Sequence, residues 1–384
     1  MAERQVNICI VSSSRADWGL LAPVVAELRA RAGFAVHLLF TGQHLDNDAA
    51  SLEQARREGF TVDGTIDMQL RQDGTAAMTR GMGRVVAGIG ERLAEGRFDC
   101  VLLLGDRYEI LCAAMAATVA RVPIAHLYGG DVTEGAFDDA IRHAITKLSA
   151  LHFVSTQGAA RRVRQLGEPS ERVHVVGSTG LDRIGQVPRM ERTDLLAEVG
   201  LDVDRPFFLV TYHPETLAAD TLADCEAMLR ALDRFPEYGV LATGSNIDPD
   251  ARAVTDRLRK YAAGRDNAVL TDNLGSRRYF AALGHAAAVV GNSSSGLYEA
   301  PSFAVATVNI GDRQKGRERA ASVIDVPADT DAVASGIEQA LALDCSRIDN
   351  PYGDGRSAGR IVDTLERIND IRLLLHKSFV DLPI

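Results

Sequence analysis

The 384-residue sequence contains few cysteines and no long apolar run. Its five cysteines are scattered and show no CxxC spacing, which argues against a cysteine metal or redox motif. Apolar sequence surrounds most of them, so we expect buried free thiols, which suit a reducing cytoplasm. No apolar run approaches the roughly 20 residues that cross a bilayer, so we expect no membrane association. Because Arg4 leads directly into a strand-like run, we expect no signal peptide.

The chain also has fewer positively than negatively charged residues. The chain has 42 Lys and Arg against 52 Asp and Glu, a net charge of −10. A nucleic-acid-binding protein needs a basic face, so this balance argues against a nucleic-acid partner. A small anionic ligand is still compatible with it, because a local basic pocket can lie in an acidic protein.

Several catalytic motifs are missing. The sequence has no G-x-x-x-x-G-K-[ST] phosphate loop and no G-x-S-x-G nucleophile elbow. No histidine or cysteine pair has the spacing of zinc ligands, so we expect no metal. Nothing in the sequence indicates a cofactor.

Apolar runs of strand length alternate with amphipathic stretches along the whole chain, which is typical of parallel sheets covered by helices. The length favours two domains over one. We predict two doubly wound Rossmann-like α/β domains, over 1–178 and 179–354, and a C-terminal helix over 355–384 that can cross back to the first domain. The predicted strands are 6–11, 35–40, 100–104, 124–127, 152–154, 173–176, 207–211, 239–243, 268–271, 286–290, 304–309 and 323–326.

Ligands of open α/β sheets bind at the carboxyl ends of the strands, and two such domains would hold a ligand in the cleft between them. The most informative strand end is a turn of small residues, Gly291-Asn292-Ser293-Ser294-Ser295-Gly296. Its backbone N–H groups and the following helix favour a phosphate, and Arg313 and Lys315 can supply cations. The alternative is a serine-rich turn that only caps a helix.

In the first domain, Arg15 follows the first strand and is placed to meet a phosphate. Asp106 and Arg107 stand side by side after the strand 100–104. Adjacent opposite charges at a strand tip are costly unless they are exposed or paired. Asp106 suits a general base or a sugar-hydroxyl ligand, and the alternative is a surface ion pair of little value.

An acidic, glycine-rich loop follows the strand 124–127. Tyr128 and Asp131 flank two glycines there, and Asp138 and Arg142 share one face of the next predicted helix at i, i+4 spacing. Acid–base chemistry requires carboxylates that a substrate can approach closely. The alternative is that Asp138 and Asp139 merely stabilise a helix N-terminus.

Two polar turns of the second domain complete the candidates. His213, in Tyr212-His213-Pro214-Glu215, follows the strand 207–211 and can stabilise a leaving phosphate. Asn246 follows the strand 239–243.

Taken together and in order, these motifs resemble the hydrolysing UDP-N-acetylglucosamine 2-epimerases of sialic and legionaminic acid synthesis. The resemblance spans nearly the whole chain and rests on the following segments: Ser14-Arg15-Ala16-Asp17, Gly105-Asp106-Arg107-Tyr108-Glu109, the helix from Asp138 to Lys147, Tyr212 to Thr216, Gly291 to Gly296 and Gly311 to Arg317. It implies a GT-B fold and a two-step reaction through a 2-acetamidoglucal, with UDP and an N-acetylmannosamine-type sugar as products. It also implies a cytoplasmic homodimer or homotetramer.

The resemblance also assigns roles. It implies that Asp106, Asp131, Asp138 and His213 are catalytic. It implies substrate or UDP contacts for Arg15, Gly19, Arg107, Tyr128, Arg142, Asn246, Ser293, Ser294, Gly296, Glu299 and Arg313. Glu299 would hold the ribose hydroxyls, and Arg15, Arg313 and His213 would offset phosphate charge as UDP leaves.

The sequence departs from some relatives at Tyr128, where they carry an acid. Tyr128 could transfer protons only with a perturbed pKa, because the ordinary value is about 10. The substrate is therefore open between UDP-N-acetylglucosamine and UDP-N,N′-diacetylbacillosamine, whose C6 methyl suits an apolar pocket with Tyr128 and Phe137. A non-hydrolysing epimerase and a glycosyltransferase are the other enzymes considered. The acid cluster disfavours a catalytically silent nucleotide-sugar sensor.

Overall fold

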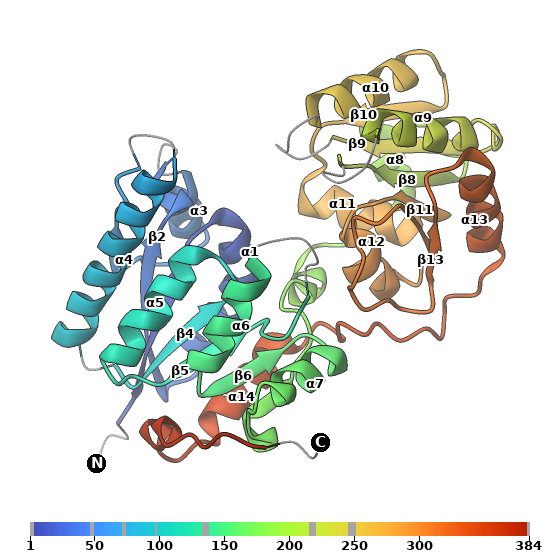
Figure 1. Ribbon diagram of the computed structural model, residues 1–384. Coiled ribbons are helices and arrows are strands. Elements are labelled where there is room, and N and C mark those ends of the chain that lie inside the picture. Colours follow the sequence, from blue (N-terminus) through green and yellow to red (C-terminus); the bar gives the residue numbers. More distant parts are fainter. Residues whose placement is uncertain are drawn as a thin grey trace. The chain divides into compact units, whose positions relative to one another are not determined.

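The computed structural model describes residues 4–46, 50–70, 74–96, 98–132, 138–214, 220–244 and 251–381. The chain divides into two compact units, Met1–Arg183 with Tyr352–Ile384, and Ile184–Pro351. We call them unit 1 and unit 2 and describe each by itself (Figure 1).

Unit 1 is built on a seven-stranded parallel sheet of order β3-β2-β1-β4-β5-β6-β7. Central strands of such a sheet are covered on both faces, and all five residues of β4 are buried. The three-residue strand β3 was not predicted, because it contains no apolar run. The strands are β1 (Val6–Ser12), β2 (Phe34–Thr41), β3 (Gly64–Ile66), β4 (Cys100–Leu104), β5 (Ile124–Leu127), β6 (Leu151–Val154) and β7 (Val173–Val175).

Helices cover both faces of this sheet and enclose two large hydrophobic cores, with a smaller cluster between β6, β7 and α7. One core lies under α1 and α14, and the other under α4 and α5. Ser14 begins α1, because its hydroxyl accepts a hydrogen bond from the Asp17 N–H at 3.2 Å. The helices are α1 (Arg15–Ala30), α2 (Gln43–Asp46), α3 (Ala50–Arg57), α4 (Thr75–Glu95), α5 (Tyr108–Val119), α6 (Asp138–Leu148), α7 (Gln157–Gln165) and α14 (Ser357–Glu366), with the short 3-10 segments η1 (Ser170–Arg172), η2 (Leu181–Gln186) and η4 (Ile371–Leu375).

The C-terminal segment contains less helix than the sequence predicted. A C-terminal helix was expected over 355–384, but α14 ends at Glu366 and the separate turn η4 follows. Asp370 begins this turn, since its carboxylate accepts the Arg372 N–H at 3.0 Å. The start of α14 is fixed by Asp182, whose carboxylate accepts the N–H groups of Ser357 and Ala358 at 2.9 and 2.6 Å.

Unit 2 repeats the architecture with a six-stranded parallel sheet of order β10-β9-β8-β11-β12-β13. The predicted strand 304–309 starts too early, because Ala304 adopts a left-handed conformation and ends a 3-10 turn. The elements are β8 (Phe207–Thr211), β9 (Gly239–Thr243), β10 (Ala268–Thr271), β11 (Ala288–Gly291), β12 (Thr307–Ile310), β13 (Val323–Val326), α8 (Arg192–Val199), α9 (Thr221–Leu232), α10 (Ala251–Ala263), α11 (Gly275–His285), α12 (Ser295–Tyr298), α13 (Thr330–Ala342) and η3 (Ala300–Phe303).

Two predictions from composition can be compared with this fold. All five cysteines are buried and free, as expected. Within the residues that the structure describes, every helix is too short or too polar to cross a membrane.

Candidate active site

In unit 1 the candidate site is organised around the buried guanidinium of Arg142. Leu104 of β4 lies in register with Leu127 of β5, so the loops after these strands leave the sheet side by side. Arg142, on α6 and only 5% exposed, reaches both loops. Its Nη2 donates to Asp106, and its Nη1 donates to the Asp131 carbonyl at 2.6 Å. One side chain thus holds two of the predicted catalytic residues at one edge of the sheet.

The remaining acids lie around the same guanidinium. Asp139 accepts from Arg142 Nη1 at 3.0 Å, and the Asp131 carboxylate accepts from the Ser155 hydroxyl at 2.7 Å. Partial burial, together with the negative charge of Asp106, raises the pKa of Asp138. The Asp138 carboxyl group therefore keeps its proton to a higher pH than an ordinary aspartate does.

A neutral histidine, His126, supports the turn that carries Asp106. His126 is fully buried at the end of β5, and its Nε2–H donates to the Gly105 carbonyl at 2.8 Å. Burial lowers the pKa of His126 to about 3, so the imidazole is uncharged at neutral pH. It therefore fixes the turn that precedes Asp106 without adding a charge to the site.

Tyr128 is turned toward the chain segment that follows β7. Its hydroxyl lies 3.0 Å from the hydroxyls of both Ser178 and Thr179, and it accepts the Thr179 N–H at 2.9 Å. Burial raises its pKa, so the phenol stays protonated. This geometry favours an anchoring role for Tyr128 and speaks against the proton transfer that an acid at this place would perform.

Arg107 lies in a second charged cluster that the motif search only partly foresaw. Its Nη2 donates to Glu109 at 3.1 Å, and Glu109 is fully buried. Asp17 is also buried, accepts hydrogen bonds from Ser13, and interacts electrostatically with Arg107. Burial raises the pKa of both carboxyl groups. No role was predicted for Glu109 from the sequence. The signal that could have indicated one is an acidic residue at the start of an otherwise apolar helix.

Arg15 and Gly19 both lie on α1. Within the part of the chain that the structure describes, no hydrogen bond joins either of them to the acids around Arg142. Arg15 is exposed at the first helical position, where a cation can meet an anion in solvent. Gly19 lies near Arg183, whose Nη1 would be 3.6 Å from an added Cβ. An alanine would fit there, so the structure gives no steric reason for this glycine.

In unit 2 the turn after β11 is held against β8 by Asn292. Gly291 has φ +140°, and an added Cβ would lie 2.0 Å from the Thr211 carbonyl oxygen, so only glycine fits. The fully buried Asn292 amide accepts the His213 N–H at 2.7 Å and donates to the His213 carbonyl at 2.8 Å. This two-way pairing brings His213 to the same edge as the serine-rich turn.

The serines and Gly296 open a helix of only four residues, α12. Ser294 is its N-cap but makes no side-chain cap hydrogen bond, while the Ser293 hydroxyl accepts the Ser295 N–H at 3.4 Å. Simple helix capping therefore does not explain Ser294. Gly296 is required by packing, because an added Cβ would lie 2.5 Å from Thr307 on β12.

Glu299 follows α12 and places a buried carboxylate oxygen, Oε2, without a hydrogen-bond partner. Burial raises the pKa of Glu299 to about 7. The neighbouring hydroxyls of Tyr279 and Ser295 form a short hydrogen bond with each other. An orphaned buried acceptor in a polar setting is a common sign of a missing ligand or water.

The loop after β12 closes the unit 2 site from the other side. Arg313 Nη1 and Gln314 Nε2 donate to the Asn292 carbonyl at 3.3 and 2.8 Å. Arg313 thus lies beside the serine-rich turn. Asn246 and Phe137 lie outside the described residues.

Comparison with known proteins can now be set beside this geometry. The model of the UDP-N-acetylglucosamine 2-epimerase family matches residues 26–366. The GDP/UDP-N,N′-diacetylbacillosamine 2-epimerase (hydrolyzing) of Campylobacter jejuni is 33% identical over 98% of this chain and 99% of its own. The polysialic acid biosynthesis protein P7 of Escherichia coli is 31% identical, over 98% of each chain. The chain belongs to the UDP-N-acetylglucosamine 2-epimerase family.

Membership of this epimerase family confirms the resemblance that the motifs indicated and the prediction of an enzyme of this type. The crystal structure of the Neisseria meningitidis UDP-GlcNAc 2-epimerase bound to UDP-GlcNAc superposes with a TM-score of 0.75. It covers 94% of this chain and 100% of its own at 18% identity, which compares the folds alone. The predicted GT-B fold of two Rossmann-like domains is confirmed.

The raised pKa of Glu299 predicts a measurable dependence of stability on pH. The native carboxyl holds its proton to about pH 7, whereas an unfolded glutamate loses it near 4.5. Folding stability should therefore fall as pH rises from about 4.5 to 7, by up to roughly 3 kcal/mol from this group. Glu299→Gln removes this pH-dependent loss of stability. In urea unfolding at pH 5 to 8, the unfolding free energy of the variant minus that of the wild type should rise with pH and become constant above pH 7.

The exposed Glu338 on α13 offers a matched control, because Glu338→Gln removes a carboxylate from the same unit without touching the site. The difference in unfolding free energy between this control and the wild type should not change with pH. An equally flat difference for Glu299→Gln would show that the carboxyl is not held neutral.

Proposed function

We propose that the protein is a hydrolysing 2-epimerase that converts UDP-N-acetylglucosamine and water into UDP and N-acetylmannosamine. In the first step the C2 proton moves to an enzyme base while the C1–O bond to UDP breaks, which gives 2-acetamidoglucal and free UDP. In the second step water adds at C1, and a proton returns to C2 from the opposite face. The atoms balance without a cofactor.

The observation that carries this proposal is the set of acids that Arg142 gathers at one strand edge. Removal and return of a proton on opposite faces of C2 require two proton carriers, and Asp106, Asp131 and Asp138 supply candidates there. We assign Asp106 to acid–base work, with Asp131 and Asp138 as its partners. Arg107 and Arg142 would contact substrate, and Arg142 also holds Asp106 and the Asp131 backbone.

We assign the leaving UDP to unit 2. The Ser293 and Ser294 turn would donate to the diphosphate, and Glu299 would accept the ribose hydroxyls with its orphaned oxygen. His213 and Arg313 lie beside this turn and would offset the charge that develops as UDP departs. Arg15, Gly19, Gly296 and Asn246 remain assigned to the nucleotide or sugar by resemblance.

A second substrate has its own support. The Campylobacter jejuni relative acts, by its name, on GDP- or UDP-N,N′-diacetylbacillosamine, and it is 33% identical to this chain. Tyr128 places a neutral, anchored ring at the position where some relatives carry an acid. A neutral ring can accept an apolar group such as the C6 methyl, which a charged acid would exclude. UDP-N,N′-diacetylbacillosamine is therefore the second candidate for the same reaction.

Incubation with each UDP-sugar in deuterated water tests the reaction and the substrate together. We expect free UDP and a manno-configured sugar that carries deuterium at C2, detected by NMR and mass spectrometry. The preferred sugar is the one with the higher kcat/KM. Recovery of an epimerised sugar still attached to UDP would contradict hydrolysis, and transfer that requires an added acceptor would indicate a glycosyltransferase.

Asp106→Asn should lower kcat by about 10²- to 10⁴-fold in this assay, because the amide can neither accept nor return the C2 proton. UDP affinity, measured by calorimetry, should stay within about threefold, since Asp106 lies in unit 1 and the nucleotide is assigned to unit 2. Asp67→Asn, at an exposed position of unit 1, is the control and should behave as the wild type. Turnover within about tenfold of the wild type for Asp106→Asn would refute the assignment.

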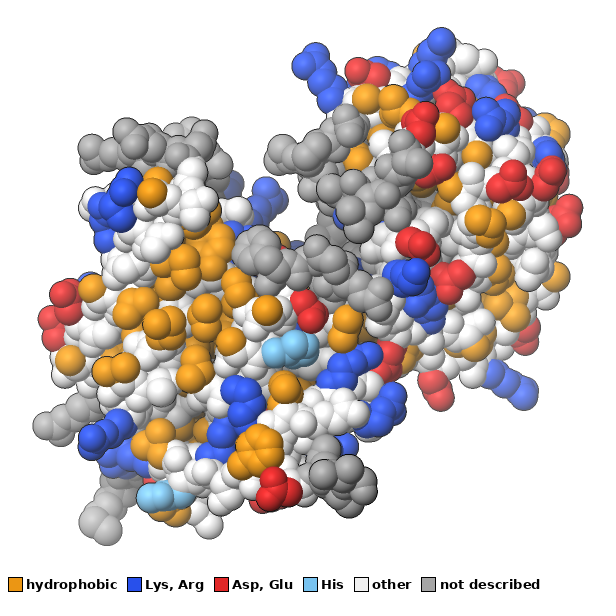
Figure 2. All heavy atoms as spheres, in the orientation of Figure 1, with side chains coloured by type: hydrophobic (Ala, Val, Ile, Leu, Met, Phe, Trp, Pro, Cys, Tyr) orange, Lys and Arg blue, Asp and Glu red, His pale blue; other side chains and the backbone are white. Residues whose placement is uncertain are grey.

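We also propose that the protein forms a homo-oligomer through the exposed side of α5. Met115 and Val119 are 46% and 85% exposed, and they lie one helical turn apart beside the partly buried Leu111. Figure 2 shows hydrophobic side chains gathered over this part of unit 1. Apolar surface of this kind usually marks an interaction site, and a second copy of the chain presents the same surface in a two-fold arrangement.

Val119→Glu should therefore dissociate the oligomer, because it would bury an unpaired carboxylate at the interface. Sedimentation equilibrium should show the subunit dissociation constant rising by more than about tenfold. Leu343→Glu adds the same charge at an exposed apolar position of unit 2 and should leave assembly unchanged. A monomeric wild type at micromolar concentration would contradict the proposal.

A further inference from the structure

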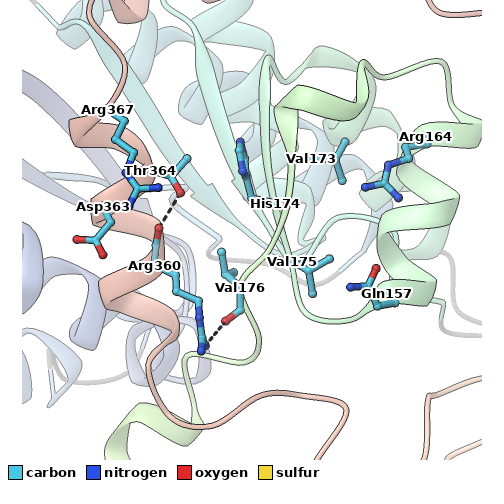
Figure 3. Close-up of a pocket in the computed structure, with 10 residues that line it drawn as sticks. All are labelled: Gln157, Arg164, Val173, His174, Val175, Val176, Arg360, Asp363, Thr364 and Arg367. Atoms are coloured by element: carbon cyan, nitrogen blue, oxygen red, sulfur yellow. Dashed lines mark hydrogen bonds between the residues drawn. The ribbon is translucent and has the colours of Figure 1, made fainter.

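A cavity of about 420 Å³ lies in unit 1 at the free edge of its sheet. Figure 3 shows β7 between two walls, with α14 on one side and α7 on the other. None of the residues predicted for the epimerase site lines it. The lining consists of Gln157, Arg164, Val173, His174, Val175, Val176, Arg360, Asp363, Thr364 and Arg367.

Two cations in this cavity have no counter-charge among the described residues. Arg164 comes from α7 and Arg367 from the end of α14, on opposite walls, and neither forms an ion pair there. The Arg164 Nε is buried and has no hydrogen-bond partner. A buried donor that is not satisfied costs free energy unless a ligand or water completes it.

The other charges of the cavity are already compensated. Arg360 makes two hydrogen bonds of 2.7 Å to Asp354 and a third, of 3.3 Å, to the Val176 carbonyl. The only lining acid, Asp363, pairs at 3.0 Å with Arg31, a cation that it shares with Glu27 and Glu366. The lining residues themselves carry three arginines against this one acid, a net charge of +2, and Arg164 and Arg367 are the two arginines among them without an ion pair in the described part of the chain.

The neutral lining adds polar groups but no negative charge. Burial lowers the pKa of His174, so its ring is neutral and offers one donor and one acceptor at physiological pH. Gln157 supplies an amide from the start of α7. The Thr364 hydroxyl donates to the Arg360 carbonyl at 2.8 Å and so leaves its oxygen lone pairs as acceptors for ligand hydroxyls.

We propose that this cavity binds a phosphate group carried by a small polar molecule. Guanidinium groups match phosphate oxygens in a planar, bidentate fashion, and a pair from opposite walls can share one phosphate. The volume lies within the range of small-molecule sites and exceeds what a bare phosphate fills, so the carrier is of hexose size. Gln157, His174 and Thr364 would meet its hydroxyls.

The position of the cavity suggests what such a ligand would affect. Arg360 joins Val176 to Asp354, and these residues belong to the segments by which the chain leaves unit 1 and returns to it. A ligand beside Arg360 would contact both segments at once.

A different role for the two arginines must be distinguished by experiment. β7 is an edge strand, and charged side chains beside an edge prevent pairing with another chain. Under that role, removal of Arg164 and Arg367 would promote self-association and no ligand would bind. The two roles therefore predict different measurements.

The test uses the full-length protein with saturating UDP, which occupies the nucleotide site and leaves the cavity as the place for a second phosphate. Calorimetric titrations with glucose 6-phosphate, inorganic phosphate and glucose compare the hexose phosphate with its two parts. We expect glucose 6-phosphate to bind best and glucose not at all. Arg164→Gln with Arg367→Gln should weaken this binding by about tenfold or more.

Arg161→Gln with Arg347→Gln removes the same net charge at exposed positions outside the cavity and should leave the affinity unchanged. Equal weakening in both double variants would show a general charge effect and overturn the proposal. So would the absence of binding to the wild type, alone or with self-association of the cavity variant. Binding that disappears when UDP is added would place the phosphate in the nucleotide site and also overturn it. The outcome does not depend on which sugar the enzyme converts.

Discussion

A buried guanidinium must be compensated on every side, and this requirement on Arg142 determines the geometry of unit 1's candidate site. The side chain is 5% exposed and contacts Asp106, the Asp131 carbonyl and Asp139, which belong to three different segments. Loss of any one acceptor would leave part of a buried charge unsatisfied, at a cost of several kcal/mol. Asp106 and Asp131 are therefore each tied to α6 through this one side chain.

Unit 2 achieves the same fixation with neutral groups. Asn292 pairs with both backbone groups of His213, and its own carbonyl accepts from Gln314 and Arg313. An amide adds no charge, so Asn292 holds the turn that would receive a diphosphate without itself adding an anion to it. Unit 1, in contrast, concentrates carboxylates where protons would move. The two units use different chemistry for the same mechanical task because their assigned ligand groups differ in charge.

The sequence predicted the strands of both sheets well, because fully buried parallel strands are short apolar runs that end at polar turns. Asp106, Asp131 and Arg313 could be selected for the same reason, since each lies two to four residues beyond the end of a strand. It could not show that Arg142 joins Asp106 across 36 residues, or that Asn292 joins His213 across 79. Such pairs depend on the order of strands in the sheet, which apolar periodicity does not encode. The strand β3 and the break after Glu366 escaped because local polar contacts decide them.

Glu109 shows how a site can retain an arrangement that stability alone does not favour. Glu109 and Asp17 are both buried and share the single guanidinium of Arg107, so one negative charge in the cluster is not neutralised when both are ionised. Burial raises the pKa of both groups, and Glu109 Oε2 and Arg107 Nε have no partner among the described residues. An apolar replacement would often stabilise such a cluster. The charged cluster holds the Arg107 guanidinium between Glu109 and Asp17, beside Asp106. This constraint would orient Arg107 toward a bound substrate.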